Sequence, residues 1–238
     1  MRTAGLGLAL VTGGASGIGA ACARRLSEDG FEVLSLDLRD PDPGTTAAGV
    51  GSRHLDVTDE DDWTSLVADL RADGAPVTAL VTSAGIVRFG GIEDCTLEDF
   101  RVVQDVNLVG TFLALRHVLP LMREHGAGSA VAVSSVAGLI PKPNQVAYVV
   151  SKWGVRGMVK AAAQDLAGTG VRVNSVHPGP VRTPMTDGLS DAVFARQPMA
   201  RRAEPEEVAN AVSFLAGPGS SYCTGAELAV DGGHVLQG

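Results

Sequence analysis

Tyr148 and Lys152 stand four residues apart in the segment YVVSK, and this pair is the feature of the sequence best suited to chemistry. On a helix, residues at this spacing share one face. The chain has 2 tyrosines and three lysines, so chance would produce such a match only about once in 40 chains of this composition. A phenol with a pKa of about 10 is a poor base at neutral pH, and a fixed ammonium stabilises its phenolate. Lowering that pKa by about three units needs about 4 kcal/mol.

A serine precedes this pair at a position that favours a role in the same chemistry. Ser135 lies 13 residues before Tyr148, just beyond the apolar run that ends at Val133. The carboxyl end of a strand is where open α/β sheets bind ligands. Ser135 can therefore donate a hydrogen bond to a substrate oxygen while Tyr148 transfers the proton. Ser134 is the competing hydroxyl, and spacing favours Ser135; a serine that only caps a loop is the other interpretation.

The segment TGGASGIG, residues 12–19, lies between an expected strand and an expected helix. Glycines there permit a tight turn, and they let the backbone approach a pyrophosphate that the helix start attracts. A glycine turn alone is often only a turn, but the strand before it, the helix after it and an acid about 20 residues later favour a dinucleotide site. The expected contacts are Gly13, Ser16, Gly17, Ile18 and Gly19.

The acid that ends the second expected strand is Asp37. A carboxylate there accepts hydrogen bonds from an adenosine ribose and repels a 2′-phosphate. Ser16 and Leu38 bring no cation to such a phosphate, so NAD is favoured over NADP; Arg39 is the residue that would support NADP. The end of the third expected strand adds two candidates for contact with an adenine ring, Asp56 and Val57.

Short apolar runs alternate with longer helical patterns, which is typical of βαβ units in a parallel sheet. The expected strands are Leu6–Val11, Glu32–Leu36, Ser52–Val57, Thr78–Thr82, Ser129–Val133, Val171–Val176 and Glu227–Val230. The expected helices are Ile18–Asp29, Asp59–Ala72, Leu97–Glu124, Ala147–Ala167 and Pro205–Leu215. The pattern predicts an α/β fold with a single doubly wound parallel sheet of about seven strands, flanked by helices on both faces. Residues 1–238 read as one domain, and the Pro- and Gly-rich stretch 38–50 predicts a loop or a single turn.

The charge and the cysteine and histidine content of the chain limit the kinds of partner it is expected to bind. The net charge is −8, and no cluster of Lys and Arg forms the electrostatic footprint of a nucleic-acid or membrane-surface binder. The 3 cysteines are far apart and form no CxxC, which favours a reducing, cytoplasmic location over disulfides or a thiolate metal site. The 5 histidines show no metal-binding spacing, and no apolar run is long enough to span a bilayer. Residues 4–11 are short and broken by glycines, so they predict a buried strand rather than a signal peptide.

Five ordered motifs together resemble the short-chain dehydrogenase/reductase family: TGGASGIG, Asn107 in VNLVG, Ser135, YVVSK and HPG at residues 177–179. The resemblance runs nearly end to end, and within the family it is strongest to bacterial hydroxysteroid and cyclic-alcohol dehydrogenases. It implies a Rossmann-type fold and NAD(P)-dependent hydride transfer, with Tyr148 as general acid/base. Lys152 would lower the phenol pKa and hold the nicotinamide ribose, and Ser135 would orient the carbonyl. Asn107, through its helix backbone, would anchor a water in a proton relay to Lys152.

The same resemblance implies further cofactor contacts. Ala84 and Gly85 would flank the adenosine ribose, and Thr183 would bond the nicotinamide carboxamide. The remaining contacts beside the cofactor are Ser83, Pro178, Gly179 and Val181. The family's Asn-Asn-Ala-Gly is Thr-Ser-Ala-Gly at residues 82–85 here, and Ser83 lacks the amide with which an Asn braces neighbouring strands.

The substrate pocket is expected between residues 86–89, 140–146 and 183–199. Its apolar lid residues, which could equally pack on their own domain, are Met185, Val193, Phe194 and Met199. They favour a secondary alcohol or ketone on a mostly apolar, cyclic or steroid-like skeleton. The family resemblance also implies a homotetramer that pairs the two long helices.

Two other functions compete with an NAD-dependent alcohol dehydrogenase. The first is a 3-oxoacyl-[acyl-carrier-protein] reductase that uses NADPH, and both Asp37 and the charge of −8 speak against it. The second is a catalytically silent nucleotide-binding regulatory protein, which the intact set of Ser135, Tyr148 and Lys152 disfavours.

Overall fold

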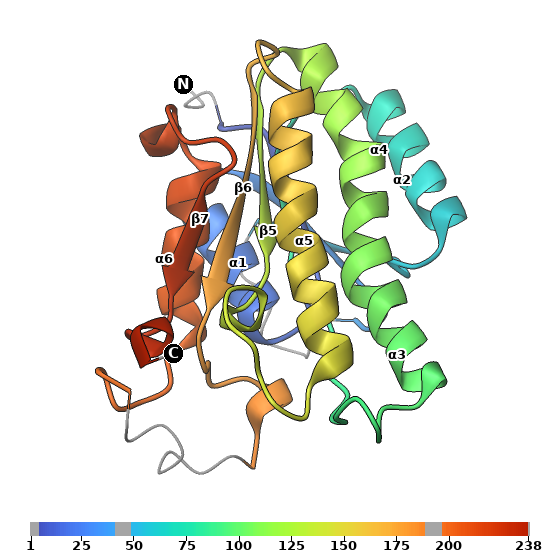
Figure 1. Ribbon diagram of the computed structural model, residues 1–238. Helices are drawn as coiled ribbons and strands as arrows, with labels where there is room; N and C mark the ends of the chain where they lie inside the picture. The colour runs from blue at the N-terminus through green and yellow to red at the C-terminus, as the bar shows by residue number, and fades with distance from the viewer. Residues whose placement is uncertain (1–4, 41–48, 189–196, 238) are drawn as a thin grey trace.

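The computed structural model describes residues 5–40, 49–188 and 197–237, and its seven strands form one parallel sheet (Figure 1). The strands are β1 (Leu8–Thr12), β2 (Glu32–Asp37), β3 (Val50–His54), β4 (Val77–Thr82), β5 (Gly128–Val133), β6 (Val171–Pro178) and β7 (Glu227–Val230). Their order across the sheet is β3-β2-β1-β4-β5-β6-β7. The predicted Rossmann-type fold is confirmed.

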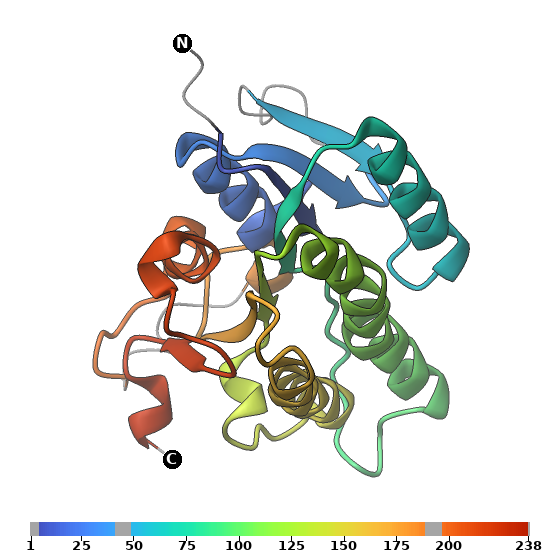
Figure 2. The same ribbon diagram turned by 90° about the horizontal axis from the view of Figure 1, so that it is seen from above.

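Helices cover both faces of this sheet (Figure 2). They are α1 (Gly17–Glu28), α2 (Glu60–Asp73), α3 (Leu97–Gln104), α4 (Gly110–His125), α5 (Val146–Asp165) and α6 (Pro205–Ala216). One apolar core lies between the sheet and the layer of α2, α4 and α5, and a second lies between the sheet and α1 with α6.

Side chains along the central strands point alternately to the two faces of the sheet and so contribute to both apolar cores. Leu8 and Leu10 of β1 point into the first core, whereas Ala9 and Val11 point into the second. Because side chains alternate across a strand, a strand with apolar residues at every position is stable only when helices cover both faces. The smaller residues on the α1 side let that helix pack close to the sheet.

The expected elements are present with small changes of their bounds, and two differences have physical causes. The third strand is Val50–His54, shorter and earlier than expected, because the chain leaves the sheet when Asp56 accepts hydrogen bonds from the backbone and hydroxyl of Thr58. The expected helix Leu97–Glu124 is interrupted by a π-helical turn, Asp105–Val109. Residues 41–48 of the expected 38–50 loop lie outside the described residues.

All seven strands run in the same direction, so their carboxyl ends meet at one edge of the sheet. The winding reverses between β1 and β4, which are neighbours although β2 and β3 lie between them in sequence. In open α/β folds, ligands bind at the carboxyl edge beside such a reversal. The ends of β1, β2, β4, β5 and β6 therefore position the site.

Candidate active site

Tyr148 and Lys152 lie on one face of the first turns of α5. The Lys152 side chain is buried, and its Nζ donates a hydrogen bond of 2.9 Å to the carbonyl oxygen of Val133 at the end of β5. The same Nζ lies 5.6 Å from the centre of the Tyr148 ring. The helix thus holds phenol and ammonium side by side at the carboxyl edge of the sheet.

Ser135, and not Ser134, contacts the phenol. The Ser135 hydroxyl is hydrogen-bonded to Tyr148 and also accepts a bond of 3.1 Å from the backbone N–H of Ala137, which caps the short 3-10 turn η2 (Val136–Gly138). Ser134 is buried and donates to the backbone carbonyl of Lys152 at 3.1 Å. The serine beside the phenol is thus Ser135, and its role in the reaction stays a prediction.

Burial disfavours the charged forms of both the phenol and the ammonium. Burial raises the pKa of Tyr148 above 10.0, and the bond from Ser135 opposes that rise. Burial lowers the pKa of Lys152 from 10.5 to about 8. That Lys152, together with a bound nicotinamide, lowers the phenol pKa stays a prediction, because in the chain alone desolvation sets the direction of the Tyr148 shift. Tyr148 is consequently a proton donor at neutral pH.

Asn107 lies in the π-helical turn and is fully buried. Its Oδ1 accepts a bond of 2.8 Å from the N–H of Ile86, and its Nδ2 donates to the Ile86 carbonyl at 3.0 Å. The same Nδ2 donates to the hydroxyl of Ser151 on α5, also at 3.0 Å. Its own carbonyl receives the Thr111 hydroxyl at 2.8 Å. Asn107 therefore joins the loop after β4 to the helix that carries Tyr148 and Lys152.

Sequence reasoning missed His177 as a support of this site and quoted it only within a motif. Its ring is fully buried; Nδ1 lies 3.0 Å from the Ser135 carbonyl oxygen and Nε2 lies 2.9 Å from the Ser175 hydroxyl. Burial lowers the pKa of His177 below 6.5, so the ring is neutral at pH 7. Its position near the end of an otherwise apolar strand was the available signal.

The phosphate loop has the backbone form that an anion site needs. Gly13 has a φ of +67°, and a Cβ on Gly19 would lie 2.0 Å from the Gly13 carbonyl oxygen, so no other residue fits there. Ser16 is the N-cap of α1, and among the described residues no side chain caps this helix and no acid lies in its first turn. Ile18 packs against the core below. The first N–H groups of α1 are thus left for a ligand.

The end of β2 is tied to this loop. One oxygen of Asp37 accepts from the N–H of Ala15 at 3.1 Å, and the other accepts from the N–H of Arg39 at 3.1 Å. The Arg39 guanidinium donates to the Ser16 hydroxyl at 3.1 Å. Leu38 is exposed. Asp37 and Arg39 therefore both lie beside the phosphate loop. Backbone N–H groups fix the Asp37 carboxylate, whereas the Arg39 guanidinium is held at the surface.

Asp56 and Val57 are engaged locally. Asp56 accepts from Thr58, as described above, and its N–H donates to Asp62 at 2.8 Å. The Val57 carbonyl receives the buried indole N–H of Trp63 at 3.1 Å, and its side chain contacts Gly110 of α4. These contacts shape the turn into α2, which lies at the same sheet edge as Asp37.

The Thr-Ser-Ala-Gly segment is braced by Thr12 at the end of β1. Its hydroxyl accepts bonds of 3.1 Å from the N–H groups of both Ser83 and Ala84. A Cβ on Gly85 would lie 3.3 Å from Asn107 Oδ1 and 3.7 Å from Lys152 Nζ, so the open space over these two side chains depends on glycine. The Thr12 hydroxyl and these two backbone N–H groups thus connect β1 to the segment after β4, without using the Ser83 side chain. Sequence reasoning missed this role of Thr12.

Beyond β6 the chain turns back toward the phosphate loop. Pro178 ends the strand, and Gly179 donates to the Val230 carbonyl at 3.0 Å. Val181 is buried, and Thr183 lies so near that a Cβ on Gly17 would be 3.3 Å from its Cγ2. The segment expected to contact the nicotinamide therefore lies beside the phosphate loop.

The residues expected around a substrate are partly exposed. Phe89, Met185 and Met199 are exposed, whereas Val193 and Phe194 lie outside the described residues. Gly90 donates to the Asn144 carbonyl at 2.9 Å, which joins the loop after β4 to the loop before α5. Exposed apolar side chains are thus present on the loops in which the substrate pocket is expected.

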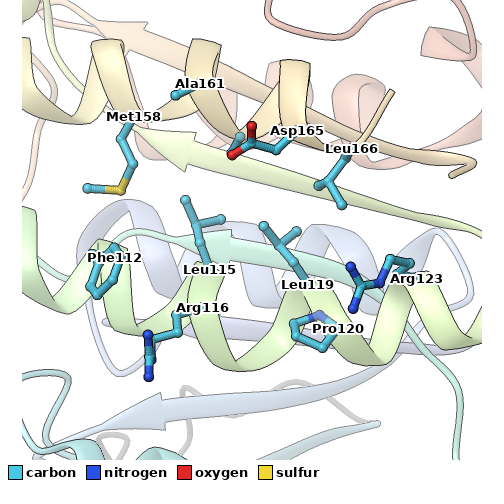
Figure 3. Close-up of a pocket in the computed structure, with 11 residues that line it drawn as sticks. Phe112, Leu115, Arg116, Leu119, Pro120, Arg123, Met158, Ala161, Asp165 and Leu166 are labelled. Carbon is cyan, nitrogen blue, oxygen red and sulfur yellow. The ribbon is translucent and has the colours of Figure 1, made fainter. Parts of the chain in front are cut away.

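A separate groove of about 400 Å³ runs between α4 and α5 (Figure 3). Its lining is mostly apolar and includes Phe112, Leu115, Leu119 and Met158.

In the described ranges, no three His, Cys, Asp or Glu side chains gather into a group able to hold a metal ion. None of the described helices combines the length and apolar character needed to cross a membrane.

A nicotinamide dinucleotide fits these residues. The uncapped start of α1 suits a pyrophosphate, the Asp37 carboxylate suits a ribose diol, and a buried ammonium beside Gly85 suits a second ribose. Ser135 and Tyr148 present two hydroxyls beside that end of the path. The arrangement can bind a carbonyl or alcohol oxygen and exchange one proton with it.

Comparison with known proteins agrees with this geometry. Residues 13–234 match the family model described as enoyl-(acyl carrier protein) reductase. The 3-alpha-(or 20-beta)-hydroxysteroid dehydrogenase of Mycobacterium bovis is 42% identical over 96% of this chain and 89% of its own length. The trans-4-hydroxycyclohexanecarboxylate dehydrogenase of Sinomonas cyclohexanicum is 40% identical over 96% of this chain and 92% of its own.

Among solved structures, the ligand-free aldohexose dehydrogenase of Thermoplasma acidophilum superposes with a TM-score of 0.90 at 33% identity, covering 97% of this chain and 94% of that chain. Fold, motifs and relatives agree on one class of enzyme. The chain belongs to the short-chain dehydrogenase/reductase family and is an alcohol/ketone oxidoreductase.

Proposed function

We propose that this enzyme interconverts a secondary alcohol and its ketone on a mostly apolar, cyclic skeleton, with NAD as cofactor. The observation that carries the proposal is the hydrogen bond between Ser135 and Tyr148 beside the buried Lys152 ammonium. When bound, NAD would take up a hydride from the carbinol carbon, and NADH would return one to the ketone carbon. Ser135 donates a hydrogen bond to the substrate oxygen, and Tyr148 exchanges the hydroxyl proton with it.

Lys152 and Asn107 complete the proton path in this proposal. Lys152 holds its ammonium between the phenol and the Val133 carbonyl, where it can also bond a ribose hydroxyl. The π-helical turn at Asn107 breaks the regular ladder of a helix, and such turns are frequent at functional sites. A water held at the Asn107 carbonyl would return the Tyr148 proton to solvent through Lys152.

Several other segments would contact the rest of the cofactor. The phosphate loop would hold the pyrophosphate, and Asp37 the adenosine ribose. Asp56 and Val57 would border the adenine. Residues 83–85 would flank the ribose, and Pro178, Gly179, Val181 and Thr183 would contact the nicotinamide. NAD is preferred over NADP because Asp37 is fixed by two backbone N–H groups, whereas Arg39 is anchored only at the surface.

The substrate class rests on the relatives and on the apolar side chains at the pocket. The two curated relatives are named for a steroid and for a cyclohexane ring. Phe89, Met185 and Met199 are exposed, and we expect them to cover a hydrocarbon ring bound at the catalytic hydroxyls. A ring carbinol therefore suits this pocket better than a polyol.

Different features of the chain support its oligomeric state, its cellular location and its domain organisation. The apolar groove between α4 and α5 suits burial against a second copy of the chain, which supports a homotetramer built on these helices. The three cysteines are free thiols, which supports a cytoplasmic location. A single sheet carries every described strand, which supports one NAD(P)-binding domain over residues 1–238.

The test is NADH formation with a panel of cyclohexanols, cyclopentanols, hydroxysteroids and linear polyols. Turnover is expected with ring alcohols and NAD, and Tyr148→Phe should lower kcat at least about 100-fold while NAD binding persists. Activity confined to polyols would contradict the apolar pocket. A preference for NADPH with a 3-oxoacyl thioester would instead favour the acyl-carrier-protein alternative.

A further inference from the structure

Lys142 is a half-buried cation that has no role in the proposed reaction. It lies in the loop between η2 and α5, seven residues after Ser135 and six before Tyr148. Its Nζ contacts Nε2 of His234, and within the described part of the chain no carboxylate pairs with it. Lys160, by contrast, pairs with Glu227 at 2.8 Å. A half-buried ammonium without a counter-ion needs an explanation, because such groups are normally paired.

Lys142 lies in one of the loops in which the substrate pocket is expected, and it contacts His234 of a second segment. His234 begins the 3-10 turn η6 (His234–Gln237), which lies at the carboxyl edge of the sheet together with η2 (Figure 1). The preceding backbone at Asp231 is so close to Gly179 that a Cβ there would lie 2.8 Å from Asp231 Cα. A Cβ on Gly232 would lie 3.1 Å from Met199. The contact between Lys142 and His234 thus joins the loop of the catalytic hydroxyls to the expected nicotinamide and lid segments.

The hydrogen-bonding pattern leaves part of the ammonium free. His234 Nδ1 lies 3.0 Å from Gln197 Oε1, which can only accept, so Nδ1 carries the proton and Nε2 accepts from Lys142. Burial first, and then the Lys142 charge, lower the pKa of His234 below 6.5, while Asp231 opposes this, so the ring is neutral at pH 7. An ammonium has three N–H donors, and His234 occupies one of them. Two donors on a desolvated cation remain for a ligand.

We propose that Lys142, oriented by His234 and Gln197, binds a carboxylate on the substrate, so that the preferred substrates are cyclic hydroxy acids and the corresponding oxo acids. This inference rests on the proposed alcohol/ketone chemistry at Tyr148. The carboxylate replaces the missing counter-ion, and the apolar residues Phe89 and Met199 cover the ring between the acid and the carbinol. A partly desolvated ion pair of this kind favours an anionic ligand over its neutral analogue.

The experiment compares 3- and 4-hydroxycyclohexanecarboxylate with their methyl esters, in wild type, Lys142→Met, Lys142→Arg and Lys160→Met. Wild type should favour at least one acid over its ester about tenfold or more in kcat/KM. Lys142→Met should lower kcat/KM for that acid about 10- to 100-fold and leave the ester within about twofold. Lys142→Arg should restore part of the preference, and Lys160→Met should match wild type.

Binding of unreactive cyclohexanecarboxylate to the NADH-saturated protein separates this inference from the proposed function. Lys142-dependent binding without turnover would overturn the proposed function and support the carboxylate site. Equal turnover of acids and esters, or equal losses for both in Lys142→Met, would overturn the carboxylate site while the dehydrogenase activity stands. Absence of both binding and turnover would overturn both.

Discussion

The side-chain amide of Asn107 donates a hydrogen bond of 3.0 Å to the hydroxyl of Ser151, and that hydroxyl donates in turn to the Tyr148 carbonyl at 2.7 Å. The π-helical turn is therefore connected to the first turn of α5 through two side chains. Since Asn107 also holds both backbone groups of Ile86, one buried amide fixes the loop after β4 relative to Tyr148. Asn107 is a positioning residue as well as the proposed anchor of a water.

Asn107→Ala is expected to lower the free energy of unfolding by about 1–3 kcal/mol, because it leaves the partly buried N–H and carbonyl of Ile86 without their side-chain partner. It should also lower kcat, since the loop and α5 are no longer joined. Ser151→Ala is the matched control, because it breaks only the connection to α5 and leaves Ile86 bonded. Urea unfolding and steady-state kinetics measure both effects, and an unchanged stability of Asn107→Ala would contradict the role of its amide.

Ser135→Ala and Ser134→Ala distinguish two adjacent hydroxyls. Ser135→Ala should lower kcat about 100- to 1,000-fold with little change in NAD affinity, because it removes the donor to the substrate oxygen. Ser134→Ala should cost about 1 kcal/mol of stability, because its bond goes to the Lys152 carbonyl, and should leave kcat within about threefold. Similar losses of kcat in both variants would show that the loop, and not one hydroxyl, supports the reaction.

The sheet and the positions of most helices could be predicted because buried parallel strands and amphipathic helices follow local patterns. The neighbours Tyr148 and Lys152 could be predicted because four residues make about one helical turn. The π-helical turn at Asn107 could not, since the helical pattern of residues 97–124 continues through it. His177 and Thr12 were missed because their partners, Ser135 and residues 83–84, are distant in sequence.

The direction of the Tyr148 pKa was also beyond the sequence. The spacing of a phenol and an ammonium indicates attraction, but it does not show how strongly either is desolvated. In the folded chain burial dominates both groups, raising the pKa of Tyr148 and lowering that of Lys152 to about 8. Burial depends on contacts of α5 with α3, η2, β6 and the π-helical turn, which only the tertiary structure brings together.

Asp37→Ser should shift the cofactor preference toward NADP. The substitution removes the carboxylate that accepts from a ribose and repels a 2′-phosphate, and it leaves Arg39 beside Ser16 to bind that phosphate. The ratio of kcat/KM for NADP to that for NAD should rise about 100-fold. Arg39→Ala in the same background should remove most of the gain with NADP. A ratio that is unchanged in Asp37→Ser would place the adenosine ribose elsewhere.

Lys152→Met is expected to abolish turnover and yet stabilise the protein without cofactor at pH 7. Burial lowers the pKa of Lys152 from 10.5 to about 8, so the folded chain holds this proton less tightly than the unfolded chain does. Below pH 8 both states are protonated, and the cost of the buried charge, about 2–4 kcal/mol from the shift, is present in full. Between pH 8 and 10.5 the unfolded state binds more protons, so wild-type stability rises relative to Lys152→Met, and the difference disappears above 10.5.

Tyr148 titrates with the opposite effect, because its raised pKa makes the folded state lose stability as pH rises above 10. The comparison is therefore made in a Tyr148→Phe background, with urea unfolding at pH 7, 8.5 and 10. Lys160→Met is the control, since that lysine is paired with Glu227 at the surface and should give no pH-dependent gain. If Lys152→Met is less stable than its parent at pH 7, or if its advantage does not shrink toward pH 10, then the Lys152 ammonium is stabilised in the folded chain, and the site holds its charge at no cost to folding.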